Sequence, residues 1–201
     1  MTAGKHADAF IRILKAILLE SGIADSEIFI TKKLTLPCYY RPTKDWDLIV
    51  KVGANLIAVI EVKSHIGSFG NNFNNRVEEA LGSATDFWAA YRESTFKPSA
   101  RPWLGYLMML EEHPKSTSKS KPKRLAHFPM RKEFQEVSYA RRYEIFCERL
   151  VRERLYDAVC FIMSSAKDGP HGKYTEPNAE LAFHNFAASL GARAAAFAKT
   201  N

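Results

Sequence analysis

The stretch Asp47-Leu-Ile-Val-Lys-Val-Gly-Ala-Asn-Leu-Ile-Ala-Val-Ile-Glu-Val-Lys63 holds two apolar, β-branched segments on either side of a Gly-Ala-Asn turn. This pattern predicts a β-hairpin with strands over 47–52 and 56–64. Alternation along the second strand places residues 56, 58, 60 and 62 on one face and residues 57, 59, 61 and 63 on the other. Glu61 and Lys63 therefore emerge side by side from an otherwise apolar face, where unpaired charges are rare.

Three charged side chains give this stretch its chemistry. If Asp47 begins the neighbouring strand, its carboxylate lies near that of Glu61. Two carboxylates can hold Mg²⁺, and the backbone carbonyl of Val62 is a further candidate ligand. Such a metal lowers the pKa of a bound water and offsets charge on a phosphate, while Lys63 orients the water or contacts the phosphate. The arrangement resembles the metal-dependent nuclease core written PD-(D/E)xK, although Trp46 stands where that motif has proline.

Other acidic residues compete for a role at this site. Asp45 shares a side with Asp47 if the strand begins early, but Asp47 adjoins the apolar run and is favoured. Glu20 is better explained as a solvated helix end than as an additional acid near the metal. Glu78 or Glu79 either supports the metal site or is a solvated acid of the kind that a helix N-terminus favours, and both interpretations stay open.

Hydrophobic periodicity predicts a single α/β domain over residues 1–201. Predicted helices cover 7–20, 74–92, 134–155 and 179–199, and further strands cover 29–31, 103–110 and 157–164. Residues 36–42 are predicted as a loop because two prolines remove backbone donors. Segment 103–110 returns beside the motif strand after a helical crossover, as in a βαβ unit. The expected architecture is a mixed β-sheet flanked by helices, as in a restriction-endonuclease-like core.

The charge of this 201-residue chain is uneven. Residues 1–100 hold 12 basic and 11 acidic side chains, whereas residues 113–154 hold 12 basic and 5 acidic ones. A local excess of this kind predicts a polyanion partner, with nucleic acid first and an anionic membrane surface second. A solvated basic surface is the alternative.

Other sequence features bear on the compartment. No apolar run approaches about 18 residues, so no membrane span is expected, and the N-terminal residues lack the apolar core of a signal peptide. Cys38, Cys147 and Cys160 are odd in number and far apart, and no zinc-binding spacing occurs. They indicate free thiols in a cytoplasmic protein.

The segment after Lys63 is rich in Gly and Asn and predicts a polar loop, in which His65 is expected to be an ordinary loop histidine rather than a proton shuttle. Amides and Arg suit base edges and phosphates, although an Asn cap on the next helix is the alternative. Basic residues of the Lys/Ser/Pro-rich segment 111–124 either contact the DNA backbone or belong to a mobile insert. Those of the Arg-rich helix over 134–155 either face DNA or form a salt-bridged surface. The candidate DNA-binding residues are Asn71, Asn72, Asn74, Asn75, Arg76, Lys121, Lys123, Arg124, Arg141 and Arg142.

The segment from Ile60 to Glu93, with its unusual string Gly67-Ser-Phe-Gly-Asn-Asn-Phe-Asn-Asn-Arg76, resembles the XhoI-type family of type II restriction endonucleases. Trp46-Asp47-Leu48, Pro102–Tyr106 and the Arg-rich helix are also similar, so the resemblance covers most of the chain. It implies a homodimer that uses Mg²⁺ to cut double-stranded DNA. The implied target is palindromic CTCGAG, cut after the first C to leave 5′ overhangs, and a two-fold dimer suits a palindrome.

By the family motif, Asp47, Glu61 and Lys63 form the catalytic set. Two other functions stay open. One is a DNA-binding protein that does not cut and whose acid cluster is structural, although the presence of all three motif residues argues against it. The other is a structure-selective junction resolvase, which shares the same core.

Overall fold

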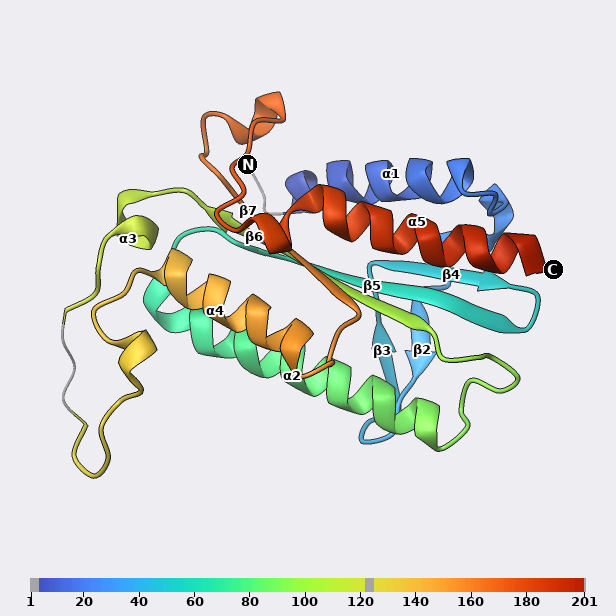
Figure 1. Cartoon of the computed structure of the whole chain (residues 1–201), viewed down its shortest axis with the longest axis horizontal. Coiled ribbons are helices and arrows are strands. Elements are labelled where there is room, and N and C mark those ends of the chain that lie inside the picture. The colour runs from blue at the N-terminus through green and yellow to red at the C-terminus, as the bar shows by residue number, and fades with distance from the viewer. Residues whose placement is uncertain (1–3, 122–124, 201) are drawn as a thin grey trace.

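The computed structural model describes residues 4–121 and 125–200, which form a five-stranded mixed sheet between two pairs of helices (Figure 1). The sheet order is β1-β4-β5-β6-β7, and a separate two-stranded sheet pairs β2 with β3. The strands are β1 (Ile28–Phe29), β2 (Thr35–Pro37), β3 (Thr43–Asp45), β4 (Leu48–Val52), β5 (Asn55–His65), β6 (Trp103–Glu111) and β7 (Ala158–Ser164). The α-helices are α1 (Gly4–Glu20), α2 (Phe69–Arg92), α3 (Pro114–Thr117), α4 (Tyr139–Arg152) and α5 (Phe183–Thr200).

The central hairpin and the crossover have the predicted topology. β4 and β5 pair antiparallel, with Leu48 opposite Ile60, and β5, β6 and β7 run parallel. Helix α2 makes the crossover from β5 to β6, as a βαβ unit requires. β5 is buried along most of its length because helices cover both faces of the sheet. The α/β class and the mixed, helix-flanked sheet are therefore confirmed.

The strict alternation predicted for β5 is wrong at its beginning. The register shifts between Val50 and Lys51, so that Val50 faces Ala58 while Lys51 faces Leu56. Ile57 is the extra residue of this irregularity, and it packs in the same core layer as Ala58. Leu56 instead joins Val59 in the opposite layer. The alternation is regular from Ala58 onward, so the irregularity does not alter which face carries Glu61.

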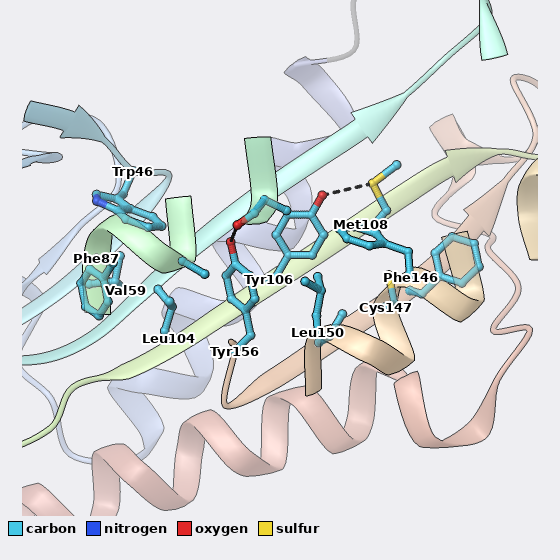
Figure 2. Packing of buried hydrophobic residues seen from close by; sticks show 14 of the residues in the cluster. Trp46, Val59, Phe87, Leu104, Tyr106, Met108, Phe146, Cys147, Leu150 and Tyr156 are labelled. Atoms are coloured by element: carbon cyan, nitrogen blue, oxygen red, sulfur yellow. Dashed lines mark hydrogen bonds between the residues drawn. The ribbon is translucent and has the colours of Figure 1, made fainter. Parts of the chain in front are cut away.

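The core layer between the sheet and helices α2 and α4 is rich in aromatic side chains (Figure 2). Trp46 and Phe87 meet edge to face, with ring centroids 5.5 Å apart. Tyr106 and Tyr156 are fully buried at the centre, and the Tyr156 hydroxyl donates to the Ala80 carbonyl at 3.0 Å. This bond supplies the partner that a buried hydroxyl needs. The layer fixes α2 against β5, which positions the middle of α2 (residues 76–86) beside Glu61 and Lys63.

The opposite core layer is formed by α1 and α5 and is more aliphatic. Leu14, Leu18 and Leu190 are completely buried there. Gly105 on β6 is required for close packing, because a Cβ at this position would lie 2.4 Å from the Trp103 ring and 2.7 Å from the Phe186 ring. None of the helices in the described part of the chain is long and apolar enough to span a membrane.

Several predicted boundaries are wrong. α2 begins at Phe69, five residues before the predicted start, because the buried Phe69 side chain anchors the first turn despite the weak helix propensity of Gly and Asn. The helix predicted over 134–155 begins as a short 3₁₀ turn at Lys132–Phe134, and α4 proper is capped by the Ser138 hydroxyl. Of residues 36–42, predicted as a loop, Leu36 and Pro37 instead belong to β2, and the loop prediction is confirmed for 38–42, which connect β2 to β3.

The remaining segments follow the predicted order with smaller differences. The chain contains short 3₁₀ turns at Asp25–Glu27, Gly169–His171 and Ala179–Leu181, and the last of these precedes α5. The Lys/Ser/Pro-rich segment, predicted as a loop, contains the single-turn helix α3 with proline at its first position. The Asn178 side chain caps this last 3₁₀ turn, and the extended backbone of Ala182 separates the turn from α5.

Candidate active site

Asp47 lies at the start of the central hairpin, where the sequence predicts it. Its backbone N–H donates to the Ile60 carbonyl at 3.1 Å, and its Oδ2 accepts from the Val62 N–H at 2.7 Å. β4 begins at Leu48 and offers no backbone partner to the Val62 N–H, so the Asp47 carboxylate takes the place of that partner. This arrangement holds Asp47 beside the backbone of residues 60–62 and next to the Glu61 side chain.

Glu61 is a buried carboxylate between two ammonium groups. Its side chain is only 2% exposed; Oε1 contacts Lys63 Nζ, and Oε2 lies 2.9 Å from Lys44 Nζ. Oε2 accepts no hydrogen bond of good geometry within the described residues. The Lys44 ammonium offsets the charge of this buried oxygen, and the remaining acceptor positions of the carboxylate suit a further cation.

Lys44 was not among the predicted site residues. It projects from β3, its ammonium lies 4.5 Å from the centre of the Trp46 ring, and it also donates to the Asp45 carbonyl at 3.2 Å. The sequence gives one weak signal, a lysine three residues before the motif aspartate. That signal has meaning only once residues 43–45 are known to form a strand.

Burial raises the pKa of Asp47, and the nearby charge of Glu61 raises it further, against the lowering effects of the Val62 N–H and of the two lysines. Ionising both carboxylates is therefore unfavourable in the absence of a further cation. The residues fit a hard divalent cation, which prefers carboxylate and carbonyl oxygen and offsets this repulsion.

The backbone of Val62 faces the same place. Its N–H points to Asp47, and the N–H and C=O of one strand residue point to the same side of the strand. β4 pairing ends at Leu48 opposite Ile60, so no β4 residue faces the Val62 carbonyl. In the described part of the chain, no three His, Cys, Asp or Glu side chains cluster as metal ligands. Two carboxylates and a carbonyl suit an ion that retains several waters, as Mg²⁺ does.

Glu61 and Lys63 line a cavity of about 700 Å³ between the β2–β3 hairpin and α2. The β2–β3 hairpin contributes Tyr40, Arg41 and Lys44 to its wall. The α2 side of the cavity is lined by Arg76, Glu78, Glu79, Leu81, Gly82, Ser83, Thr85 and Asp86. The cavity is open to solvent at charged residues of both signs, so a phosphate group can approach Lys63 from this side.

The other acidic residues considered for the site differ in where they lie. Asp45 is exposed and accepts from the Thr35 hydroxyl across the β2–β3 pair. Glu20 is exposed on α1, which covers the face of the sheet opposite to Glu61. Glu78 and Glu79 are exposed in the third turn of α2, where they line the cavity, and Glu79 pairs with Arg76.

His65 is not a loop residue, contrary to the prediction. It is the last residue of β5, is buried, and its Nδ1 lies 2.6 Å from the Tyr143 hydroxyl. It packs against Phe69 and Tyr143, the aromatic residues that also fix the start of α2. Burial lowers the pKa of His65, which favours the neutral ring. Its contacts explain it as a packing residue at the end of the motif strand.

The predicted DNA-binding asparagines lie in a helix rather than in a loop. Asn71, Asn72, Asn74, Asn75 and Arg76 all fall in the first two turns of α2, and the side chains of Asn74 and Asn75 are exposed. The first turns of a helix attract anions, which suits phosphate contacts.

The basic candidates divide into two groups. Lys121 and Arg142, together with Asn74, line a cavity of about 1320 Å³ between α2, α4 and residues 125–136. Arg142 also donates to the Ser120 hydroxyl at 2.8 Å, and Arg141 forms an ion pair with Glu144 at 2.8 Å. Arg141 is therefore part of a salt-bridged surface. Lys123 and Arg124 lie outside the described residues.

Half-buried Asp47 and buried Asp86 are expected to affect the stability of the fold in opposite directions. The raised pKa of Asp47 means that its ionised form destabilises the fold at neutral pH, and this penalty disappears as pH falls through the raised pKa towards the ordinary value of 3.8. We expect Asp47→Asn, without metal, to be at least as stable as the wild type at pH 7 in urea unfolding. Its advantage should shrink as the pH is lowered towards 3.8.

Asp86 provides the matched control for that measurement. Burial alone would raise its pKa, but hydrogen bonds from the Tyr40 and Tyr39 amides and the contacts with Cys38 and Arg41 outweigh burial, so the pKa is lowered. Ionised Asp86 therefore stabilises the fold above pH 3.8 and loses that effect on acidification. We expect Asp86→Asn to lose about 1–3 kcal/mol at pH 7. Equal losses in the two variants would contradict the assigned pKa directions.

The fold and the site together define the class of protein to which this chain belongs. A mixed sheet flanked by helices, with Asp47, Glu61 and Lys63 gathered at the end of the central hairpin, is the arrangement of a restriction-endonuclease-like nuclease. The family model for restriction endonuclease XhoI matches residues 1–176, and the chain belongs to this family. It is accordingly a type II site-specific deoxyribonuclease, as the sequence resemblance predicts.

Three relatives support this assignment. The type II restriction enzyme BstVI of Geobacillus stearothermophilus is 48% identical over 196 residues, which cover 94% of this chain and 87% of that protein. XhoI of Xanthomonas vasicola is 43% identical over 74% of this chain and 60% of its own length. AbrI of Azospirillum brasilense is 48% identical over 57% of this chain and 53% of its own length. No solved structure matches the chain.

Proposed function

We propose that the protein cleaves both strands of palindromic CTCGAG with Mg²⁺, leaving 5′ overhangs, as the nuclease of a restriction-modification system. The observation that carries the proposed chemistry is the position of Asp47 beside buried Glu61, which lines one cavity together with Lys63. The specificity rests on the resemblance of segment 60–93 to the XhoI-type family and on the 43% identity to XhoI. Type II restriction enzymes use divalent metal ions, and Mg²⁺ is the one that this donor set favours.

Asp47, Glu61 and the Val62 carbonyl are the proposed metal ligands. When bound, the metal supplies an activated water and charge compensation at the scissile phosphate. Lys63, the more exposed of the two lysines on Glu61, then orients the attacking water or the phosphate oxygen. Lys44 is held by Trp46 and by the Asp45 carbonyl, and it keeps the Glu61 carboxylate in place.

DNA recognition is assigned to two regions. The first is the N-terminal part of α2, with Asn71, Asn72, Asn74, Asn75 and Arg76. The second is the basic region of residues 113–154, with Lys121, Lys123, Arg124, Arg141 and Arg142. A homodimer is proposed because two equivalent sites related by a two-fold axis match the two strands of a palindrome. The proposed location is the cytoplasm, where the protein meets DNA.

A plasmid digest tests the proposal. Wild-type protein and Asp47→Ala are incubated with DNA and either Mg²⁺ or EDTA, and all product ends are sequenced. We expect discrete fragments whose ends all come from divided CTCGAG sites with 5′-TCGA overhangs, formed only by the wild type and only with Mg²⁺. Cutting at another fixed sequence would overturn the specificity while leaving the chemistry intact. Cutting in EDTA, or undiminished cutting by Asp47→Ala, would contradict the metal site.

A further inference from the structure

The β2–β3 hairpin forms one wall of the active-site cavity but is not part of the main sheet. Its strands pair only with each other, from Thr35 opposite Asp45 to Pro37 opposite Thr43. β3 carries Lys44 to Glu61, and the tip, residues 38–42, reaches the middle of α2. Figure 1 shows the hairpin on the α2 side of the sheet. The hairpin therefore links the Glu61 carboxylate to the exposed tip at residues 38–42.

A single buried carboxylate fixes the tip of this hairpin. Asp86 Oδ1 accepts from the Tyr39 and Tyr40 N–H groups at 2.8 and 2.9 Å, and Asp86 Oδ2 accepts from Arg41 Nε at 2.8 Å. The Asp86 side chain is 5% exposed, so its three donors are held in a defined geometry. Such a set of charge-assisted bonds is stronger than a surface ion pair.

The tip presents Tyr40 and Arg41, whose side chains are of the kinds that donate hydrogen bonds to DNA phosphates. Tyr40 is 71% exposed, and the Arg41 side chain is 46% exposed although it is bonded to Asp86. That bond uses Nε and so orients the planar guanidinium, whose terminal nitrogens form a fork that suits phosphate. Arg41, Lys44 and Lys63 all line the same cavity.

The spacing of these residues suits one DNA strand. Arg41 precedes Lys44 by three residues, which span at most about 10 Å of extended chain. Three nucleotides of one strand rise by about the same distance along the DNA axis. A strand with its scissile phosphate at Glu61 and Lys63 therefore has a neighbouring phosphate within reach of Arg41.

We infer that Arg41 is a phosphate-binding residue that fixes the DNA strand within about three nucleotides of the cleaved bond, and that Asp86 is its positioning residue. The inference rests on the proposed catalytic set, because Glu61 and Lys63 define where the scissile phosphate lies. It adds a contact on the β2–β3 hairpin, apart from the asparagines of α2 and the basic residues of 113–154.

The test is equilibrium binding without metal, so that it does not depend on cleavage. Wild type, Arg41→Gln and Arg41→Lys are titrated in EDTA against two fluorescent duplexes of equal length, one with CTCGAG and one without it. Loss of a phosphate contact lowers the slope of log affinity against log salt by about one and weakens both duplexes alike. We expect Arg41→Gln to lose roughly tenfold in affinity with this slope change, and Arg41→Lys to recover part of both.

Arg101→Gln is the matched control. Arg101 is 49% exposed and pairs with Asp157, whose other oxygen accepts from a backbone amide, so it resembles Arg41 in exposure and in its aspartate partner, although it also stacks on the Trp88 ring. It lies five residues before Tyr106, the residue level with Glu61, at a distance of about 16 Å along β6. We expect Arg101→Gln to retain the wild-type affinity and slope, and thermal unfolding shows whether each variant is folded.

Three outcomes would overturn the inference: an unchanged salt slope in Arg41→Gln, an equal change in Arg101→Gln, or a loss confined to the CTCGAG duplex, which would indicate base reading. If the proposed catalytic set is wrong, a cleavage assay will show that Glu61→Gln still cuts DNA. The two failures are therefore distinguishable, because one is read from binding and the other from cleavage.

Discussion

Glu61→Gln is expected to lower DNA cleavage by at least about 10³-fold while leaving metal-free DNA binding within a few-fold of the wild type. Glu61 is the most buried charged group of the site, and it is the residue between Asp47 and the two lysines. A neutral amide oxygen binds a hard cation more weakly than a carboxylate because it brings no negative charge, and weaker metal binding removes several kcal/mol of transition-state stabilisation. Cleavage is measured in single turnover and binding by fluorescence anisotropy.

A second variant protects this prediction against misfolding. Removing the negative charge leaves Lys44, whose side chain is 12% exposed, without its main partner, and a broken buried pair can cost about 3–5 kcal/mol. Glu61→Asp keeps the charge but withdraws the carboxylate by one methylene. It is expected to fold and also to lose cleavage. Glu93→Gln, at the exposed end of α2, is the neutral control. Cleavage at the wild-type rate by folded Glu61→Gln would refute the metal-ligand role.

The part of the site that lies on one hairpin is predictable from the sequence. Asp47, Glu61 and Lys63 are placed by strand periodicity and by the tight turn at Gly53-Ala54, which are local properties of the chain. The register shift at Ile57 does not disturb them, because it occurs before the motif. The β5–α2–β6 crossover is also predictable, since a long apolar run after a helix has few other places to pair.

Features that depend on distant contacts are not predictable in this way. The 36–42 segment has the prolines of a loop, yet Asp86, more than 40 residues later in the chain, holds its tip in place. Lys44 therefore cannot be assigned to the site until the hairpin is known. The early start of α2 likewise depends on burial of Phe69, which is a tertiary effect that outweighs local propensity.

The two lysines on Glu61 are expected to differ in importance, with Lys63→Met losing about 10²–10³-fold in cleavage and Lys44→Met no more than about tenfold. Lys63 is 26% exposed and reaches Glu61 from the edge of the cavity, so it can turn to the water or the phosphate. A positioned proton-transfer group contributes about 10²–10⁴-fold. Lys44 is fixed by three contacts, to Glu61, the Trp46 ring and the Asp45 carbonyl, which suits a residue that holds the carboxylate.

Metal affinity separates these roles from a general loss of charge. Each substitution removes one positive charge beside Asp47 and Glu61, so both variants should bind a divalent cation more tightly than the wild type in calorimetric titrations. Lys63→Met thus combines tighter metal binding with a large loss of cleavage, which a merely disturbed site does not produce. If Lys44→Met proves the slower enzyme of the two, the catalytic lysine is the one on β3, and the motif lysine instead serves to neutralise Glu61.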